Sequence, residues 1–245
     1  RILSSAASDV YKRQGFRRVL DFIEPGVWEY EIEAEYSHEF LNNRSKGFAY
    51  QPIIASGINS CCLHYNTNNM QCKDGEMVLM DVGSEYANYR SDMTRTVPIN
   101  GKFSKRQLQI YNAVLNVKNE ANKILRPGTS IDMYHKEIAK IMESELLDIK
   151  LIDKTDIKNQ NPKNPAYKRY FMHGTSHHLG LDVHDVGNFY EDVKAGNVFT
   201  IEPGIYIKEE SLGIRLEDDI LVGNNNNINL MAVSYTHLRA HETVV

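Results

Sequence analysis

The chain has 245 residues with ordinary hydrophobic (42%) and charged (24%) fractions, which suits one large globular domain with a sizeable core. Its net charge of −4 and the lack of a basic block argue against a nucleic-acid partner. No window approaches the ~18 apolar residues of a membrane span, and no signal-peptide pattern is present. The three cysteines, two of them adjacent, fit neither a disulfide framework nor a zinc ribbon. We therefore expect a cytoplasmic protein with reduced thiols and no membrane partner.

The two ends of the chain do not continue the patterns of its middle. Residues 1–14 lack sustained helical or strand periodicity, and residues 232–245 do not extend the segment before them. Both resemble translated sequencing-adapter segments, so we expect them to be non-native and assign the fold to residues 15–231. On this interpretation His237 and His241 are not metal ligands, despite their helical spacing.

The first elements are a helix and several strands. Trp28, Ile32, Tyr36 and Phe40 recur at helical spacing and predict an amphipathic helix over residues 27–43. A strand-like start near residue 50, a polar loop at 66–69 and a strand at 76–80 follow, with a hairpin turn at Asp74-Gly75. Residues 81–98 predict two strands around a loop at 84–88.

Two helices and a strand-rich segment complete the pattern. Ser104, with Gln107 three residues later, is typical of a capping box and predicts a helix that ends near Leu125. A second helix is expected at about 131–147, and the polar residues 152–168 predict an exposed loop or insertion. Strands and loops are expected at 169–188, 196–207 and 213–223, followed by a polar turn at 224–227.

The sequence contains one weak internal repeat. Glu24-Pro25-Gly26-Val27 and Arg126-Pro127-Gly128-Thr129 each open a helix, 102 residues apart. A duplicated helix-plus-hairpin unit would explain the repeat. Coincidence would explain it too, because Pro-Gly before a helix is common.

Four acidic residues stand in or beside segments that otherwise predict buried strands. Asp81 follows the apolar run 77–80, and Asp92 stands 11 positions after Asp81, while Glu202 and Glu217 interrupt apolar runs near the end of the chain. Asp is depleted in strands, and a buried carboxylate costs several kcal/mol unless it is paired, neutralised or bound to metal. These acids therefore indicate a metal site.

A histidine-rich segment lies between the two acid pairs. Four histidines, at positions 173, 177, 178 and 184, fall within twelve residues. Histidine is the commonest metal ligand and carries protons near neutral pH. A cluster of this density between two acid pairs favours ligands and proton carriers over isolated core or surface residues.

The motifs around these residues resemble the aminopeptidase P (Xaa-Pro aminopeptidase) and prolidase family of dinuclear metallopeptidases. The resemblance covers about residues 15–230 and rests on five motifs in order: 79–83, 91–96, 173–187, 200–204 and 213–219. It implies an α+β, pita-bread (creatinase/aminopeptidase) fold, with a curved antiparallel sheet backed by two helix pairs in pseudo-twofold symmetry. The repeated Pro-Gly helix starts are consistent with that symmetry.

The resemblance implies a set of metal ligands, namely Asp81, Asp92, His177, Glu202 and Glu217. In it, Asp81 chelates one ion, His177 and Glu202 bind the other, and Asp92 and Glu217 bridge. Five ligands exceed what one catalytic ion with an open position takes, and suit two ions ~3.5–4 Å apart. Four carboxylates and one imidazole favour Mn²⁺, Co²⁺ or Fe²⁺ over structural zinc. We expect Mn²⁺, with Co²⁺, Fe²⁺ or Zn²⁺ as alternatives.

Further roles also follow from the resemblance. His64 matches a histidine near the leaving group, and His173 and His184 match residues that steady the carbonyl oxygen and the tetrahedral intermediate. Glu202 is also expected to receive the proton from the nucleophilic water, and the nucleophile is expected to be a hydroxide that bridges the metals. Arg215 is expected to pair with a ligating carboxylate and fix its orientation.

His178 and four further acidic residues lie within the five motifs but outside the implied ligand set. His178 stands where the family often has a bulky aromatic residue, and we expect it to line the pocket without contacting metal. Four further acids are interpreted as hydrogen-bond supports or solvated charges: Asp182, Asp185, Asp218 and Asp219.

The leading hypothesis is a metal-dependent aminopeptidase that hydrolyses the N-terminal Xaa-Pro bond of peptides. Within the enzymes, a prolidase acting on Xaa-Pro dipeptides or a methionine aminopeptidase is the alternative. Creatinase-like hydrolysis of a non-peptide substrate, or a binding module that has lost its metal, is a third hypothesis, disfavoured because all five ligand positions are filled. Family members usually carry an N-terminal domain and form homo-oligomers. We expect that domain to be missing here, which would lower turnover.

Overall fold

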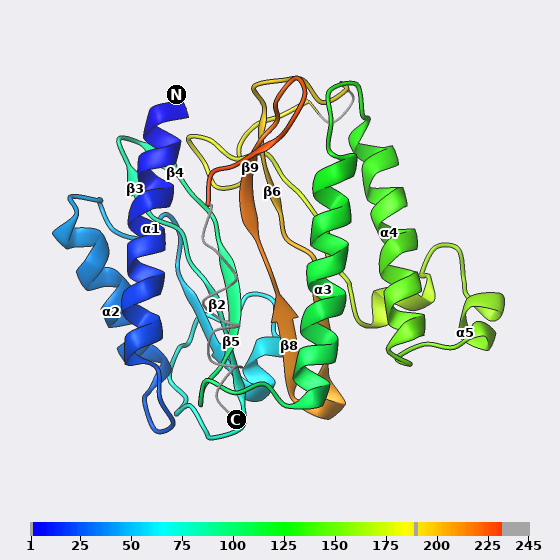
Figure 1. The fold of residues 1–245 in the computed structure, drawn as a ribbon, viewed down its shortest axis with the longest axis horizontal. Coiled ribbons are helices and arrows are strands. Elements are labelled where there is room, and N and C mark those ends of the chain that lie inside the picture. Colours follow the sequence, from blue (N-terminus) through cyan, green and yellow to red (C-terminus); the bar gives the residue numbers. More distant parts are fainter. Residues whose placement is uncertain (1, 189–190, 232–245) are drawn as a thin grey trace.

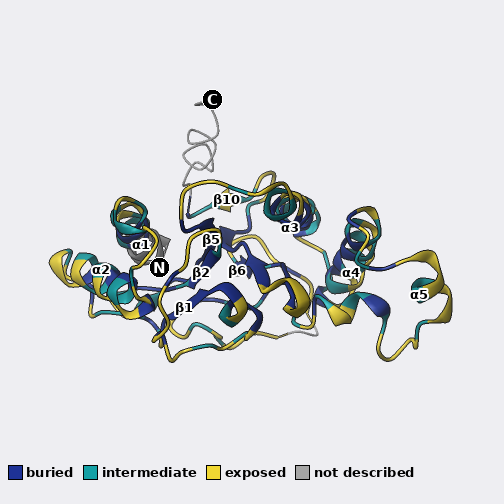
Figure 2. Ribbon diagram, turned by 90° about the horizontal axis from the view of Figure 1, so that it is seen from below, coloured by how far each residue is buried: buried dark blue, intermediate teal, exposed yellow. Residues whose placement is uncertain are grey.

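Two pairs of helices flank a central group of antiparallel strands in the computed structural model of the chain, which describes residues 2–188 and 191–231 (Figure 1). Seen end on, the strands are the buried part, and the helices expose their outer faces (Figure 2). No helix among the described residues is long and apolar enough to cross a membrane.

The first half of the chain is built from two helices and a three-stranded sheet. Helix α1 (Ile2–Phe22) packs against α2 (Glu29–Asn42). The antiparallel strands β1 (Ile53–Ser56), β2 (Met77–Asp81) and β5 (Thr94–Pro98) lie in the order β1-β2-β5. A small hairpin of β3 (Glu85–Tyr86) and β4 (Tyr89–Arg90) connects β2 to β5.

The second half repeats this plan. Helix α3 (Lys105–Ile124) packs against α4 (Ile131–Asp148), and a short α5 (Lys154–Asn159) follows. Strands β6 (Val198–Ile201), β9 (Asp218–Leu221) and β10 (Ile228–Asn229) lie in the order β10-β9-β6. Strand β7 (Gly204–Ile207) pairs with β8 (Leu212–Arg215). The chain also contains 3₁₀ turns at Gly57–Cys61, Ala166–Arg169 and Lys208–Glu210.

The two Pro-Gly helix starts have equivalent backbone contacts. Gly26 (φ +104°) and Gly128 (φ +86°) both adopt a positive φ, which glycine tolerates without steric cost. The N–H of Gly26 donates to Cys72 O, and the N–H of Cys72 donates to Val27 O, both at 2.8 Å. In the second half, Val193 takes the place of Cys72: it accepts from Gly128 at 2.8 Å and donates to Thr129 O at 2.9 Å. The repeat in the sequence therefore corresponds to a structural repeat.

The repeat places the four acids at equivalent points. Asp81 ends β2, and Glu202 directly follows β6. Asp92 precedes β5, which pairs with β2, and Glu217 precedes β9, which pairs with β6. The halves join where β5 lies beside β8: the N–H of Glu217 donates to Thr94 O at 3.0 Å. The pseudo-twofold relation thus brings acids from both halves to one seam.

Alternation along the strands aims these acids away from the helices. In β2, Val78 and Met80 pack into the core beneath α1 and α2, so Asp81 lies on the opposite face with Leu79. In β6, Phe199 and Ile201 pack with α3 and α4. Truncating a fully buried aromatic residue in such a core costs about 3–5 kcal/mol. A one-residue slip of a strand would move its buried side chains to the opposite face, so the register of these strands is strongly specified.

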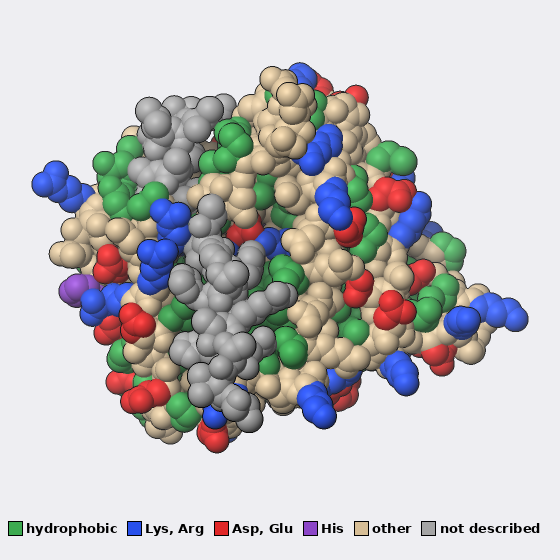
Figure 3. All heavy atoms as spheres, in the orientation of Figure 1, with side chains coloured by type: hydrophobic (Ala, Val, Ile, Leu, Met, Phe, Trp, Pro, Cys, Tyr) green, Lys and Arg blue, Asp and Glu red, His purple; other side chains and the backbone are tan. Residues whose placement is uncertain are grey.

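The structure confirms three predicted helices, near 27–43, 104–125 and 131–147. The capping box is present: Ser104 Oγ accepts from the N–H of Gln107 at 3.2 Å, and Gln107 Oε1 accepts from the N–H of Ser104 at 2.8 Å. On the face seen in Figure 3, basic and acidic side chains intersperse over α3 and α4, and several form pairs within one turn, such as Lys136 with Asp132. Such exposed pairs contribute little stability.

Four local predictions were wrong. Residues 2–14 are helical, because α1 packs against α2 and tertiary contacts override weak periodicity. The segment 152–168 contains α5, whose N-cap Asp153 accepts from the N–H groups of Thr155 and Asp156. The segment 169–188 forms a 3₁₀ turn and loops in place of strands. Asp74-Gly75 turns the chain before β2 but does not join a hairpin, because 20 residues separate β1 from β2.

The assignment of residues 1–14 as non-native sequence stays a prediction, and so does the boundary of a catalytic domain at 15–231. Residues 232–245, with His237 and His241, lie outside the described residues.

Candidate metal centre

A pocket of about 610 Å³ opens at the seam between the two halves. All of the site residues predicted from the sequence line it: His64, Asp81, Asp92, His173, His177, His184, Glu202, Arg215 and Glu217. Its remaining walls come mainly from residues 50–53, 63–66 and 174–183. Residues up to 167 positions apart in sequence, Tyr50 and Glu217, therefore face one cavity.

Three of the predicted ligands converge most closely. Ligand atoms of Asp92, His177 and Glu217 all lie within 4.8 Å of one another. Asp92 and Glu217 are buried, with 5% and 1% of their surfaces exposed. Asp81 and Glu202 line the same pocket but stand outside this tight group.

The buried carboxylates resist ionising together. Burial, followed by the charge of Asp81, raises the pKa of Asp92 to about 6. Burial also raises the pKa of Glu202 to about 8, although His177 and Arg215 oppose the rise. The pKa of Glu217 is raised well above its usual range by burial and by Asp92 and Glu202. In each case burial, which disfavours the ionised form, is the largest cause of the shift.

His177 joins the two halves of the acid cluster. Its Nε2 lies 3.6 Å from Asp92 Oδ2 and 3.7 Å from Glu202 Oε1, and its Nδ1 is 3.1 Å from the carbonyl oxygen of His178. Burial lowers the pKa of His177, but the hydrogen bond and charge of Asp92, with the charge of Glu202, outweigh burial and raise it to about 9. The carbonyl of His178 accepts from Nδ1, which leaves Nε2 facing the acids.

Asp81 is held by two residues on opposite sides. Arg215 Nη2 donates to Asp81 Oδ2 at 2.6 Å, and the hydroxyl of Tyr50 contacts Asp81 Oδ1. The same hydroxyl lies 2.5 Å from Asp92 Oδ1. One O–H can donate to only one of the two carboxylates, so Tyr50 ties them together without neutralising them.

Arg215 also anchors a chain of hydrogen bonds that ends at His173. Arg215 Nη1 donates to the hydroxyl of Tyr206 at 2.9 Å, and Tyr206 lies 2.8 Å from His173 Nε2. His173 Nδ1 lies 2.8 Å from the carbonyl oxygen of Gly174, which can only accept. Burial and the charge of Arg215 lower the pKa of His173 to about 4, so the ring is neutral: Nδ1–H donates to Gly174 and Nε2 accepts from Tyr206.

The other histidines differ in their surroundings. His184 stacks against His177, with ring centroids 4.2 Å apart, and burial followed by the charge of His177 lowers its pKa. His64 is exposed at the pocket edge. The expectation that His178 lines the pocket was wrong: its ring packs on Phe199 (4.2 Å between centroids) and against Gly187, where an added Cβ would meet it at 1.8 Å. Because the His178 ring packs on Phe199, it does not line the pocket.

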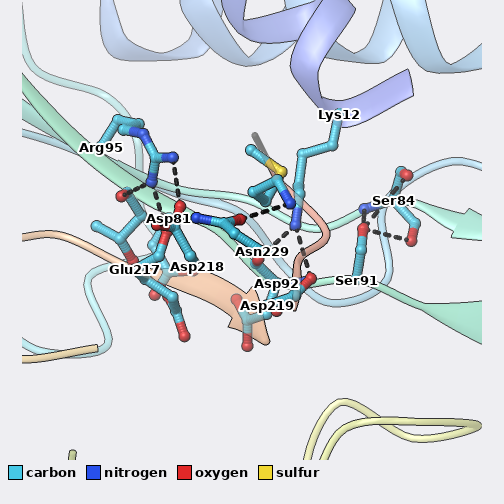
Figure 4. A network of polar contacts seen from close by, with 12 residues as sticks. Lys12, Asp81, Ser84, Ser91, Asp92, Arg95, Glu217, Asp218, Asp219 and Asn229 are labelled. Carbon is cyan, nitrogen blue, oxygen red and sulfur yellow. Dashed lines mark hydrogen bonds and ion pairs between the residues drawn. The ribbon is translucent and has the colours of Figure 1, made fainter. Parts of the chain in front are cut away.

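Behind the pocket, three buried cations compensate two further acids. Figure 4 shows Lys12 beside Asp219 and Arg95 beside Asp218. Asp218 receives hydrogen bonds from Arg95 (2.5 Å), from Lys118 and from Asn229 (2.8 Å). Burial raises the pKa of Asp218, but Lys118 and Arg95 outweigh it and hold that pKa well below its usual range. Arg95 also donates to the carbonyl oxygen of Glu217, so this cluster fixes the backbone of a predicted ligand.

Asp219 performs a similar task for Asp92. Its Oδ2 accepts from the N–H of Asp92 at 2.9 Å and from Lys12 Nζ at 3.0 Å, while Lys12 also bonds to the carbonyl oxygen of Asp92. Asp185 Oδ1 and Oδ2 accept from the N–H groups of Val186 (2.9 Å) and Leu181 (3.2 Å), and Asp182 is exposed. The four additional acids are therefore hydrogen-bond supports or solvated charges, as predicted.

Several residues with clear roles were missed by the sequence analysis. Tyr50, Thr94, Arg95 and Tyr206 all contact predicted site residues, and Thr94 Oγ1 donates to Glu217 Oε2 at 2.7 Å. Arg95 offered one signal, since an arginine inside a five-residue buried strand needs a partner. The tyrosines offered none, because their spacing fits an ordinary core.

The donor set fits divalent metal ions. Four carboxylates line the pocket, and one arginine, Arg215, is already paired with Asp81. Burial raises the pKa values of Asp92, Glu202 and Glu217, so their ionised forms are disfavoured, and a cation bound beside them would stabilise those forms. Oxygen and imidazole donors without thiolate suit hard to borderline divalent ions.

A family comparison agrees with this geometry. The profile of metallopeptidase family M24 matches residues 7–224. The chain belongs to metallopeptidase family M24.

The chain is also similar to curated proteins and to solved structures. The chain is 41% identical over 227 residues to Xaa-Pro aminopeptidase of Escherichia coli strain K12, covering 88% of this chain and 51% of the relative. It is 36% identical over 217 residues to human Xaa-Pro aminopeptidase 3, covering 84% and 42%. The zinc-substituted E. coli aminopeptidase P in complex with product superposes with a TM-score of 0.90 at 37% identity, covering 98% of this chain and 57% of that one.

These matches establish the M24 pita-bread fold, as the sequence predicted. The chain spans about half the length of the curated relatives it matches.

Proposed function

We propose that this chain carries the catalytic site of a metal-dependent aminopeptidase that hydrolyses the N-terminal Xaa-Pro bond of peptides. The observation that carries the proposal is the convergence of Asp92, His177 and Glu217 in one pocket with Asp81 and Glu202. The relatives named Xaa-Pro aminopeptidase support the choice of substrate.

Two divalent ions would be held by the five predicted ligands: Asp81, Asp92, His177, Glu202 and Glu217. We propose Mn²⁺ as the ion, with Co²⁺, Fe²⁺ or Zn²⁺ as substitutes, because the donors are mostly carboxylate oxygens. When bound, the ions supply Lewis acidity that makes water nucleophilic at neutral pH and polarises the scissile carbonyl.

The side chains around the ions would move protons and fix geometry. Bound cations would favour the ionised form of Glu202, which would then accept a proton from the attacking water. Arg215 fixes the rotamer of Asp81 through its 2.6 Å bond.

The pocket histidines would act on the substrate. His184 and His64, both exposed on the pocket wall, lie within reach of a bound peptide and would steady the intermediate and the leaving group. His173 has both ring nitrogens engaged, so contact with the carbonyl oxygen requires Nε2 to exchange Tyr206 for substrate. Removing one such contact typically lowers kcat by ~10²–10³.

We also propose that peptides with proline at the second position are the natural substrates, that the protein acts in the cytoplasm, and that it functions as a homo-oligomer.

A peptide-length series tests the substrate. The metal-loaded chain is assayed on Arg-Pro, Arg-Pro-Pro and Arg-Pro-Pro-Gly-Phe, with Arg-Ala-Pro and Met-Ala-Ser as controls. The proposal expects release of the first residue from the tripeptide and pentapeptide only where proline is second. Cleavage confined to Arg-Pro would identify a prolidase, and cleavage of Met-Ala-Ser would identify a methionine aminopeptidase.

Metal analysis separates an enzyme from a binding module. The purified chain, incubated with Mn²⁺ and desalted, is expected to retain close to two ions per chain. Retention of none, together with no hydrolysis of any peptide, would favour a non-catalytic binding module and overturn the proposal.

A further inference from the structure

Glu29 is a buried carboxylate that the proposed chemistry does not use. It sits in the first turn of α2 with none of its surface exposed, and it does not line the pocket. A buried ionised carboxylate persists only when its oxygens are well satisfied. The hydrogen-bond donors around Glu29 therefore identify the segment that it positions.

Five donors from one connected stretch of chain converge on Glu29. Its Oε1 accepts from the N–H of Ser56 (2.7 Å), from the hydroxyl of Ser56 (2.7 Å) and from Asn59 Nδ2 (3.2 Å). Its Oε2 accepts from the hydroxyl of Tyr65 (2.7 Å) and from the N–H of Met70 (2.9 Å). Each donor is a neutral N–H or O–H group, and the N-terminus of α2 adds a favourable dipole.

The backbone of Glu29 also bonds to this stretch of chain. Its own N–H donates to Met70 O at 3.0 Å, so residues 29 and 70 exchange two hydrogen bonds. One helical turn further, Glu33 Oε2 accepts from Asn68 Nδ2 at 2.8 Å. Helix α2 thus presents two carboxylates to the same loop.

The stretch held in this way forms one wall of the pocket. Leu63, His64 and Asn66 line the cavity, and they lie between Asn59 and Met70. Residues 62–70 contain no helix or strand, so their path depends on side-chain contacts. Tyr65, which bonds Glu29, is the immediate neighbour of His64.

We propose that Glu29 is a positioning residue: it fixes the loop 62–70 and so places His64 and Leu63 at the pocket wall. This inference rests on the proposed function for the role of His64, but its structural content is independent of any activity. Glu29 lies outside the metal site, so its loss should move the loop without removing metal.

The test compares Glu29→Gln with Glu31→Gln in the full chain. Both variants remove one negative charge from the first turn of α2, but Glu31 is partly exposed and its carboxylate caps the N–H of Trp28. In Glu29→Gln, one acceptor oxygen becomes an amide donor that faces other donors. Amide hydrogen exchange at Ser56 and Met70 is expected to rise at least tenfold, and to stay unchanged in Glu31→Gln.

Kinetics on Arg-Pro-Pro provide the second measurement. Displacement of a pocket residue by ~1 Å can cost roughly 10²-fold in rate, so kcat is expected to fall by about that factor in Glu29→Gln while bound metal is unchanged. Glu29→Asp, which keeps the charge, should recover part of the exchange protection.

Tyr65→Phe covers the case in which Glu29→Gln does not fold. It removes one hydrogen bond of the five, and the His64 ring resonances are expected to shift. Unchanged exchange at Met70 in a folded Glu29→Gln, or unchanged His64 resonances in Tyr65→Phe, would overturn the proposal. If the parent chain cleaves no Xaa-Pro peptide, the proposed function fails, and the exchange data still decide the role of Glu29.

Discussion

Arg215 donates to Asp81 across the seam between the two halves of the fold, with 2.6 Å between Nη2 and Oδ2. Arg215 is 4% exposed, and its other nitrogens reach Thr94 Oγ1 (3.0 Å) and Tyr206 (2.9 Å). One planar group therefore sets the orientation of a carboxylate from β2, a hydroxyl from β5 and a phenol from β7.

Replacing Arg215 by lysine should separate geometry from charge. A lysine ammonium keeps the charge but cannot reproduce three contacts of a planar fork. We expect Arg215→Lys to lower kcat by roughly 10²-fold, since ligand-orienting partners typically contribute 10–100-fold. Steady-state kinetics on Arg-Pro-Pro check this, with Arg106→Lys, which affects a pair with Glu210 away from the pocket, as the control. Equal rates for both variants would contradict it.

The two central acids should be indispensable for metal. Asp92→Ala and Glu217→Ala are each expected to remove at least one ion and nearly all activity, because ligand atoms of both carboxylates and of His177 lie within 4.8 Å of one another and both carboxylates are proposed to bridge the ions. Elemental analysis of the desalted variants measures the ions. Asp132→Ala, an exposed acid on α4, serves as the control and should keep the parental metal content. Two ions and retained activity in either pocket variant would refute the bridging role.

The metal-free protein should lose stability as pH rises. The folded-state pKa values of Glu202 (about 8) and His177 (about 9) lie above their ordinary values of 4.5 and 6.5. A raised pKa means that the folded state binds the proton more tightly, so its stabilisation is complete below the ordinary value and is lost as pH passes through the raised one. We expect the melting temperature to fall by about 5 °C between pH 6 and pH 9.

Metal should remove this pH dependence, because the ions replace the protons. Saturation with Mn²⁺ at ~100 times its Kd adds about 2.7 kcal/mol at 25 °C. Scanning calorimetry of the metal-free and loaded chain at both pH values provides the check. A metal-free protein that melts higher at pH 9 than at pH 6 would contradict the assignment of these pKa shifts.

The cluster behind the pocket should matter for folding. Asp218→Asn leaves Arg95 and Lys118 buried without their carboxylate, and breaking a buried ion pair in this way costs about 3–5 kcal/mol. Denaturant unfolding of the metal-free chain measures the loss, and Asp132→Asn in the exposed pair with Lys136 is the control. A loss no larger than that of the control would mean that the cluster contributes no net stability.

Metal re-addition should identify the ion. The chain stripped of metal and supplied in turn with Mn²⁺, Co²⁺ and Zn²⁺ is expected to show the highest turnover of Arg-Pro-Pro with Mn²⁺, because the oxygen-rich donor set suits that ion. Full activity with Zn²⁺ alone would argue for a zinc enzyme instead.

Local patterns in the sequence accounted for much of the fold. The helices at 27–43, 104–125 and 131–147 followed from apolar spacing and capping residues, which act within a few positions of the chain. Helix α1 was missed in residues 2–14, because its formation depends on packing against α2. His178 was misplaced for a similar reason, since its contact with Phe199 is not visible in either local segment.

By itself, the sequence determined which residues would be costly to bury alone: Asp81, Asp92, Glu202 and Glu217 interrupt or border apolar strands, and that cost is local. The tertiary structure decided which partners compensate them. Tyr50, Arg95 and Lys118 reach these acids or their neighbours across 31 to 123 positions. A pairing over such distances depends on strand register and helix packing, which the linear order of residues does not display.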